Sequence, residues 1–144
     1  MITRRKFIAQ SSLLASAMAI PTMLMSSTTL DKENENQTFD VIIIGGSYAG
    51  LSAAMALGRS LRKVLLIDSG LPCNRQTTHS HNFITQDGEE PKNIANKAKA
   101  QVLNSQTVFF QEDIASKVTR NGKVFELTTQ SGKTFLTEKI LFAT

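Results

Sequence analysis

The sequence predicts an α/β protein with a Rossmann-like βαβ unit, followed by an antiparallel β-ribbon. A continuously apolar run at residues 41–44 (VIII) is typical of a strand buried in a parallel sheet. It leads into a glycine turn at residues 45–50 (GGSYAG), which opens a helix rich in small residues. A second apolar run, residues 64–67, ends on Asp68. The order strand, glycine turn, helix, strand and acid is that of a dinucleotide-binding unit.

The glycines of this turn have separate predicted roles. Gly45 permits the tight turn at the strand end, and Gly50 lets the helix pack closely against the strand. The helix N-terminus then presents free N–H groups to a pyrophosphate. Ser47 stands where a GxGxxG fingerprint has its second glycine, and Gly46 precedes it. Serine is small, and its hydroxyl can itself bond a phosphate oxygen.

Asp68, at the end of the second strand, is a candidate ligand for the ribose hydroxyls of an adenosine. The alternative is that Asp68 caps the turn at residues 69–72. A carboxylate here disfavours a 2′-phosphate and hence NADP at this site. FAD and NAD share the ADP half, so the fingerprint alone does not decide between them.

The first 27 residues are typical of an export signal. Arg4, Arg5 and Lys6 precede an uncharged stretch, residues 7–30, rich in Ala, Ser, Leu and Met. Consecutive arginines followed by Lys-Phe-Ile resemble the twin-arginine motif, which implies export of a folded protein to the periplasm or another extracytoplasmic space. The alternative is an uncleaved membrane anchor, although a spanning helix is weakened by Ser11, Ser12, Ser16, Pro21 and Thr22. Residues 28–38 are polar and predict a flexible spacer.

Composition excludes several classes of site. The formal net charge is +4, but Arg4, Arg5 and Lys6 account for most of it, so nucleic-acid binding is not expected. A single cysteine, Cys73, rules out an internal disulfide and a Cys-rich metal site. His79 and His81 lack further ligand-type neighbours in the sequence, so we expect no metal centre.

The second half of the chain predicts one helix and several strands. Pro91 is suited to a helix start, and Ile94, Ala98 and Val102 form an apolar stripe. Residues 107–110 predict a third strand of the sheet. Residues 114–119, 125–129 and 134–136 predict the antiparallel ribbon, with turns at residues 121–122 and 131–132. Residues 139–144 predict a final buried strand.

Residues 39–144 resemble the low-molecular-weight thioredoxin reductase family and its relatives. The resemblance is carried in order by VIIIGGSYAGLSAA, VLLIDSG, HNFIT with QDG, the Pro91 helix and the terminal KILFAT. The GGSYAG, PCNR and HSHNF segments are similar to a divergent branch, which includes proteins without established thioredoxin activity. The resemblance implies a Rossmann-like FAD-binding domain in which the excursion after Asp68, residues 69–90, wraps FAD.

The resemblance also implies roles for residues of this excursion. Asn74, Arg75 and Gln76 are candidates near the adenosine or pyrophosphate, and Thr77, Thr78 and Asn82 are candidates nearer the isoalloxazine. A solvated polar loop is the alternative for each of them. The full set of predicted cofactor-binding residues is Gly45, Gly46, Ser47, Tyr48, Ala49, Gly50, Asp68, Asn74, Arg75, Gln76 and Asn82.

The predicted function is electron transfer from NAD(P)H through FAD to a disulfide, a thiol pair or another acceptor. In the resembled family, an NAD(P)H-binding domain, with the Cys-x-x-Cys pair in thioredoxin reductases proper, follows the segment seen here. We therefore expect residues 39–144 to be the N-terminal, truncated part of an FAD domain, and we assign no catalytic residue. The family also suggests a homodimer. The alternatives are an inactive nucleotide-binding fragment and an NAD-dependent dehydrogenase.

Overall fold

The computed structural model describes residues 38–144. The predicted signal at residues 1–27 and the spacer up to residue 37 lie outside the described residues. Thr38, which the spacer was expected to include, is the first residue of a strand.

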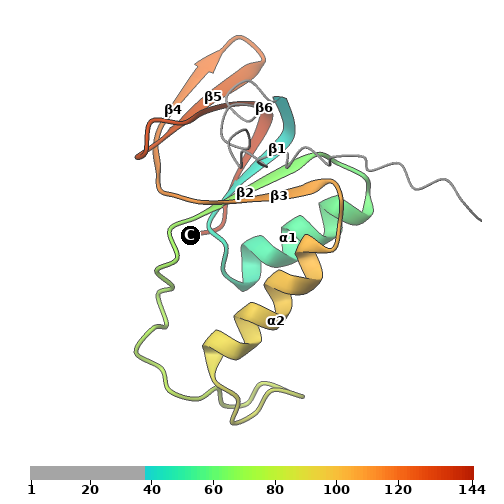
Figure 1. The fold of residues 1–144 in the computed structure, drawn as a ribbon, viewed down its shortest axis with the longest axis vertical. Helices are drawn as coiled ribbons and strands as arrows, with labels where there is room; N and C mark the ends of the chain where they lie inside the picture. Colours follow the sequence, from blue (N-terminus) through green and yellow to red (C-terminus); the bar gives the residue numbers. More distant parts are fainter. Residues whose placement is uncertain (1–37) are drawn as a thin grey trace, which may run out of the picture.

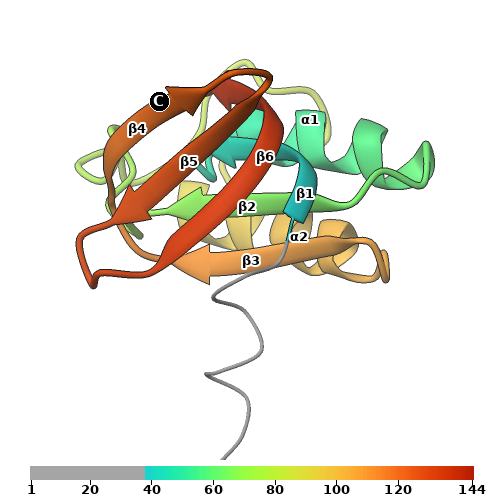
Figure 2. The ribbon, with the colours of Figure 1, turned by 90° about the horizontal axis from the view of Figure 1, so that it is seen from above.

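The described chain forms three layers, with one sheet at its centre (Figure 1). Two helices cover one face of a parallel sheet, and an antiparallel ribbon lies against the opposite face (Figure 2). The strand order is β3-β2-β1-β6-β5-β4. The elements are β1 (Thr38–Ile44), α1 (Tyr48–Arg59), β2 (Val64–Asp68), α2 (Pro91–Leu103), β3 (Val108–Glu112), β4 (Ala115–Asn121), β5 (Val124–Thr129) and β6 (Thr134–Phe142). The predicted α/β class with a Rossmann-like unit and an added ribbon is confirmed.

The first core layer lies between the parallel strands and the helices. Ile43 and Leu66 point from neighbouring strands into this layer, where they meet Leu51 of α1 and Val102 of α2. Burying side chains of this kind contributes roughly 1.5–3 kcal/mol each. Ala98 and Val102 of the apolar stripe predicted for α2 belong to this layer, and Ile94, the third residue of the stripe, is buried as well. Pro91 stands at the first turn of this helix as expected.

The second core layer lies on the opposite face of the same strands. Ile42, Leu65 and Ile67 pack there against Leu127 of β5 and Phe135 of β6. Side chains from both faces of β1 and β2 are thus buried. This double burial explains why these strands are apolar without alternation.

Strand β6 corrects the sequence prediction of two strands at residues 134–136 and 139–144. It is one strand whose first part pairs antiparallel with β5, while residues 136–142 pair parallel with β1. The expected burial of its end is also wrong, because Leu141 is 40% and Phe142 is 67% exposed. An apolar composition predicts a strand, but burial also requires a covering layer, and none of the described elements covers these side chains.

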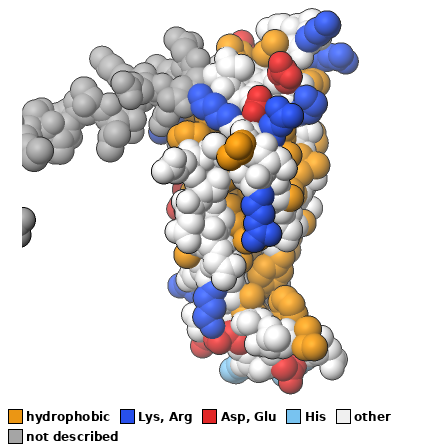
Figure 3. All heavy atoms as spheres, turned by 90° about the vertical axis from the view of Figure 1, so that its right-hand side faces the viewer, with side chains coloured by type: hydrophobic (Ala, Val, Ile, Leu, Met, Phe, Trp, Pro, Cys, Tyr) orange, Lys and Arg blue, Asp and Glu red, His pale blue; other side chains and the backbone are white. Residues whose placement is uncertain are grey.

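The described surface is mixed in character. On the face shown in Figure 3, Lys and Arg side chains are spread from top to bottom with acidic side chains among them. Within residues 38–144, neither helix is long and apolar enough to cross a membrane.

Asp113 links the parallel sheet to the ribbon. Its backbone N–H donates to the carbonyl oxygen of Asp68 at 2.9 Å, and its carboxylate accepts hydrogen bonds from the Ser131 hydroxyl and the Ile114 N–H. The Ser131 hydroxyl is the main cause that lowers the pKa of the Asp113 carboxyl from 3.8 to about 2.

We expect Asp113→Asn to weaken the dependence of stability on acidic pH. A carboxyl whose pKa is depressed in the folded state stabilises it fully above about pH 4, and this contribution is lost as pH falls toward about 2. Urea unfolding of the chain between these pH values measures the slope. Ser131→Ala should reduce the slope as well, and an unchanged slope in both variants would contradict the assignment.

Candidate functional site

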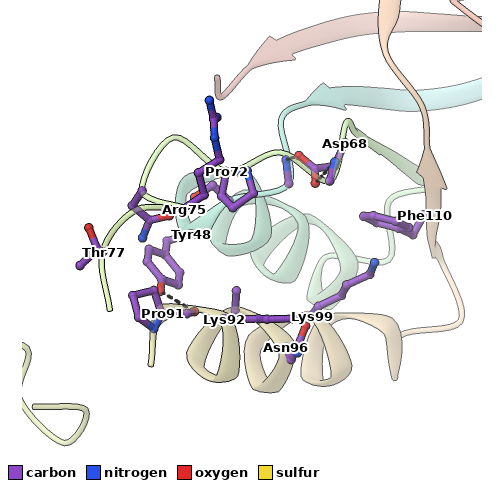
Figure 4. Close-up of a pocket in the computed structure, with 15 residues that line it drawn as sticks. Tyr48, Asp68, Pro72, Arg75, Thr77, Pro91, Lys92, Asn96, Lys99 and Phe110 are labelled. Atoms are coloured by element: carbon purple, nitrogen blue, oxygen red, sulfur yellow. Dashed lines mark hydrogen bonds between the residues drawn. The ribbon is translucent and has the colours of Figure 1, made fainter. Parts of the chain in front are cut away.

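The main pocket lies beside the carboxyl ends of the parallel strands and the first turn of α1. Its volume is about 400 Å³, within the range of roughly 300–1,000 Å³ usual for small-molecule sites. Figure 4 shows α1 and α2 on two sides of it, with the beginning of the excursion above. The lining residues are Gly46, Ser47, Tyr48, Asp68, Gly70, Pro72, Asn74, Arg75, Thr77, Pro91, Lys92, Ala95, Asn96, Lys99 and Phe110.

The glycine turn is held by close backbone packing. Gly45 has a φ of +105°, in the region that favours glycine, and a Cβ here would stand 2.5 Å from the carbonyl oxygen of Ala143. A Cβ on Gly50 would stand 1.8 Å from the carbonyl oxygen of Gly45. The predicted roles of both glycines, a tight turn and close helix packing, are confirmed.

Gly46 has a role that the fingerprint did not predict. Its N–H donates to Oδ1 of Asp68 at 2.7 Å, and a Cβ on Gly46 would lie 2.6 Å from the Cβ of Asp68. The glycine turn therefore contacts the end of β2 through Gly46, the residue before Ser47. Close contact with Asp68 requires a glycine at position 46, and this requirement is independent of the serine that replaces the second glycine of the fingerprint at position 47.

Ser47 adopts ordinary extended backbone, with φ −78° and ψ −171°, so the fold does not demand glycine there. It is the N-cap residue of α1, yet its hydroxyl makes no capping hydrogen bond. The first turn of α1 carries no acidic residue either. No side chain of residues 38–144 caps the N–H groups of this turn, and the positive end of the helix borders the pocket.

Asp68 caps the following turn and also borders the pocket, and its role as a ribose ligand stays a prediction. Its Oδ2 accepts the Gly70 N–H at 3.0 Å, which caps the following turn, while its side chain also lines the pocket. Each carboxylate oxygen can accept more than one hydrogen bond, so acceptor capacity remains for a ligand hydroxyl.

The pocket gathers only some of the predicted residues. Asn74 and Arg75 of the excursion line it together with Tyr48. Gln76 and Asn82 lie outside it, and the Asn82 N–H donates instead to Oδ1 of Asp87 at 2.8 Å. Their role at a cofactor stays a prediction. Gly45, Ala49 and Gly50 shape the turn without lining the pocket.

Sequence reasoning missed one wall of the pocket. Lys92, Asn96 and Lys99 of α2 line it, with Phe110 of β3 at its end (Figure 4). Their spacing of four and then three residues marks one polar face of α2, beside the apolar stripe. That periodicity is visible in the sequence, but it does not say which partner the polar face meets.

The pocket favours an anionic ligand. Arg75, Lys92 and Lys99 bring three cationic side chains to its lining, against the single carboxylate of Asp68. Among residues 38–144, no three His, Cys, Asp or Glu side chains are placed to hold a metal ion together. His79 and His81 lie on exposed parts of the excursion.

The excursion is anchored to the rim of the pocket through Tyr48. The Tyr48 hydroxyl donates to the carbonyl oxygen of Pro91 at 3.1 Å, which joins the first turns of α1 and α2. The Tyr48 ring also packs edge-on against Phe83 of the excursion. These contacts fix the side of the pocket farthest from Phe110.

Comparison with known proteins identifies the family. The model of the pyridine nucleotide-disulphide oxidoreductase family matches residues 39–144. The chain belongs to this family. It is 35% identical to a probable thioredoxin reductase of Arthroderma benhamiae over 95% of this chain and 34% of that protein. It is 31% identical to the thioredoxin reductase sirT of Leptosphaeria maculans over 74% of this chain and 33% of that protein.

A solved structure agrees with this assignment. An oxidoreductase from Agrobacterium tumefaciens is 38% identical, with a TM-score of 0.71 over 74% of this chain and 36% of that one. The chain thus spans about a third of the length of these relatives.

Gly46→Ala should destabilise the fold by about 1–3 kcal/mol, because the added methyl group would overlap the side chain of Asp68. Ser47→Gly should cost only a few tenths of a kcal/mol, since the backbone conformation is kept. Urea unfolding of the two variants beside the unsubstituted chain measures both effects. Equal stability of all three proteins would show that Gly46 and Asp68 are not in close contact.

Proposed function

We propose that this chain is the FAD-binding part of an NAD(P)H-dependent flavoprotein oxidoreductase. The observation that carries the proposal is that the uncapped first turn of α1 and the carboxylate of Asp68 share one pocket. A helix N-terminus favours a pyrophosphate, and a carboxylate at the end of the second strand accepts ribose hydroxyls. Family membership and the thioredoxin reductase-like relatives support the same assignment.

The residues present fit the ADP half of FAD. Gly46 and Ser47 of the glycine turn line the pocket, and Ser47 adds an exposed hydroxyl. Arg75 supplies a guanidinium suited to a phosphate oxygen. Lys92, from the facing wall, adds a second cation that offsets the charge of the pyrophosphate.

When bound, FAD supplies the hydride and electron chemistry between NAD(P)H and an acceptor. The residues described here bind and orient the nucleotide and neutralise its charge. The acceptor we propose is a disulfide, a thiol pair or another oxidant, and NAD(P)H would be held by a domain outside residues 1–144. The long polar excursion that brings Asn74 and Arg75 to the pocket favours FAD over an NAD-dependent dehydrogenase.

We expect the purified chain to retain FAD through gel filtration, visible as a flavin absorption spectrum. Arg75→Met should weaken FAD binding by roughly tenfold or more, because a charge-assisted hydrogen bond contributes about 1.5–3 kcal/mol. Arg120→Met, on the exposed ribbon, is the control and should bind as the unsubstituted chain does.

A colourless protein that binds NAD but not FAD would refute the flavin assignment. Addition of NAD(P)H to the FAD-loaded chain then tests electron transfer. We expect little bleaching of the flavin, because residues 1–144 contain a single glycine-turn unit.

We also propose that the protein is exported through a twin-arginine-type signal. The support is the sequence alone: Arg4 and Arg5 precede the uncharged residues 7–30. This route carries folded proteins, which suits a domain that acquires its cofactor before export. The exported protein would act in the periplasm or another extracytoplasmic space.

Replacing both Arg4 and Arg5 by Lys should abolish export of a folded reporter fused after residue 38, since the two arginines carry the motif. Cell fractionation measures the reporter in each compartment. Lys6→Gln, which leaves the pair intact, should export normally. Export that persists with both arginines replaced would point to a general secretory signal.

A further inference from the structure

Lys99 is a pocket cation that has no ionic partner among the described residues 38–144. Its ammonium lies 3.3 Å from the centroid of the Phe110 ring, and its side chain is half-buried. Among residues 38–144, no carboxylate lies within 4.0 Å of this ammonium, and the side chain donates no hydrogen bond. The Phe110 ring is thus its one specific contact in the described part of the chain.

Lys97, two residues earlier on the same helix, shows the contrast. Its ammonium lies 3.2 Å from the carboxylate of Glu89, and its side chain is 61% exposed. Lys97 therefore reaches both solvent and a carboxylate, whereas the Lys99 ammonium lies over the Phe110 ring. A partly desolvated ammonium is favoured by a second electron-rich partner, which a ligand in the pocket can provide.

The position of Lys99 in the pocket indicates which part of a bound nucleotide its ammonium would contact. Figure 4 shows Asp68, Phe110 and the amino end of Lys99 toward one end, and Tyr48, Arg75 and Thr77 toward the other. The first turn of α1, where a pyrophosphate is favoured, begins at Tyr48. A ribose held at Asp68 with its 5′ carbon toward that turn would direct its base away from the turn, to the end of the pocket where Lys99 and Phe110 lie.

We propose that Lys99, supported by Phe110, binds the adenine ring of FAD and makes this pocket selective for an adenine nucleotide. The ammonium lies against the electron-rich face of the adenine, and Phe110 holds the lysine in place before the ligand arrives. This inference rests on the proposed FAD function. Lys99 takes no part in electron transfer and acts as a specificity-determining residue.

The test compares 5′-ADP with UDP, which share the ribose and the diphosphate and differ in the base. Calorimetric titration of the chain gives both affinities for the unsubstituted protein, Lys99→Met, Lys99→Arg and the control Lys97→Met. Lys99→Met should weaken ADP binding by roughly 3- to 30-fold. UDP binding should change much less, because the smaller uracil ring reaches less of the lysine. Lys99→Arg should retain ADP affinity, and Lys97→Met should leave both affinities unchanged.

Two results would overturn the proposal. An equal loss of ADP and UDP affinity in Lys99→Met would mean that Lys99 binds the ribose or the phosphates. Unchanged ADP affinity in Lys99→Met would mean that it binds no part of the nucleotide. Both leave FAD binding by the unsubstituted chain intact, so they refute this inference alone. Failure of the unsubstituted chain to bind FAD and ADP would refute the FAD function as well.

Discussion

The carboxylate of Asp68 joins the two segments that border the pocket. One oxygen accepts the Gly46 N–H from the glycine turn, and the other accepts the Gly70 N–H at the start of the excursion. Hydrogen bonds to a charged group stabilise by about 1.5–3 kcal/mol each. The two hydrogen bonds therefore fix the spacing between the glycine turn and the excursion. Because Gly46 lies so close to the Asp68 side chain, position 46 has no room for a Cβ.

The glycine turn is also held by the end of β6, the strand that belongs to both the ribbon and the parallel sheet. Strand β6 pairs with β5 in the ribbon and with β1 in the parallel sheet, so the ribbon and the nucleotide unit form one hydrogen-bonded sheet. Just beyond it, the Ala143 N–H donates to the carbonyl oxygen of Ile44 at 2.8 Å, and the Ala143 carbonyl lies against Gly45. A residue far along the chain thus sets the conformation of the turn.

Helix α2 gives the pocket its chemical character. Its apolar stripe packs on the layer beneath the sheet through Ala98 and Val102, and Ile94 is also buried, while the neighbouring polar face of the helix lines the pocket beside the first turn of α1. Lys92 and Lys99 therefore oppose a helix N-terminus that is itself positive, and Asp68 is the one carboxylate in the lining. Such a pocket is suited to a ligand that carries both anionic phosphates and neutral hydroxyls.

The sequence by itself determined the βαβ unit, the glycine turn and the place of Asp68 at the strand end. These features depend on short-range patterns: a buried strand is continuously apolar, and a tight turn needs glycine. Tertiary structure alone decided that β6 is one continuous strand with an exposed end, that Lys99 and Phe110 meet in the pocket, and that Asn82 lies outside it. Helical periodicity defines a face but not its partner, and an irregular excursion has no periodicity that fixes its path.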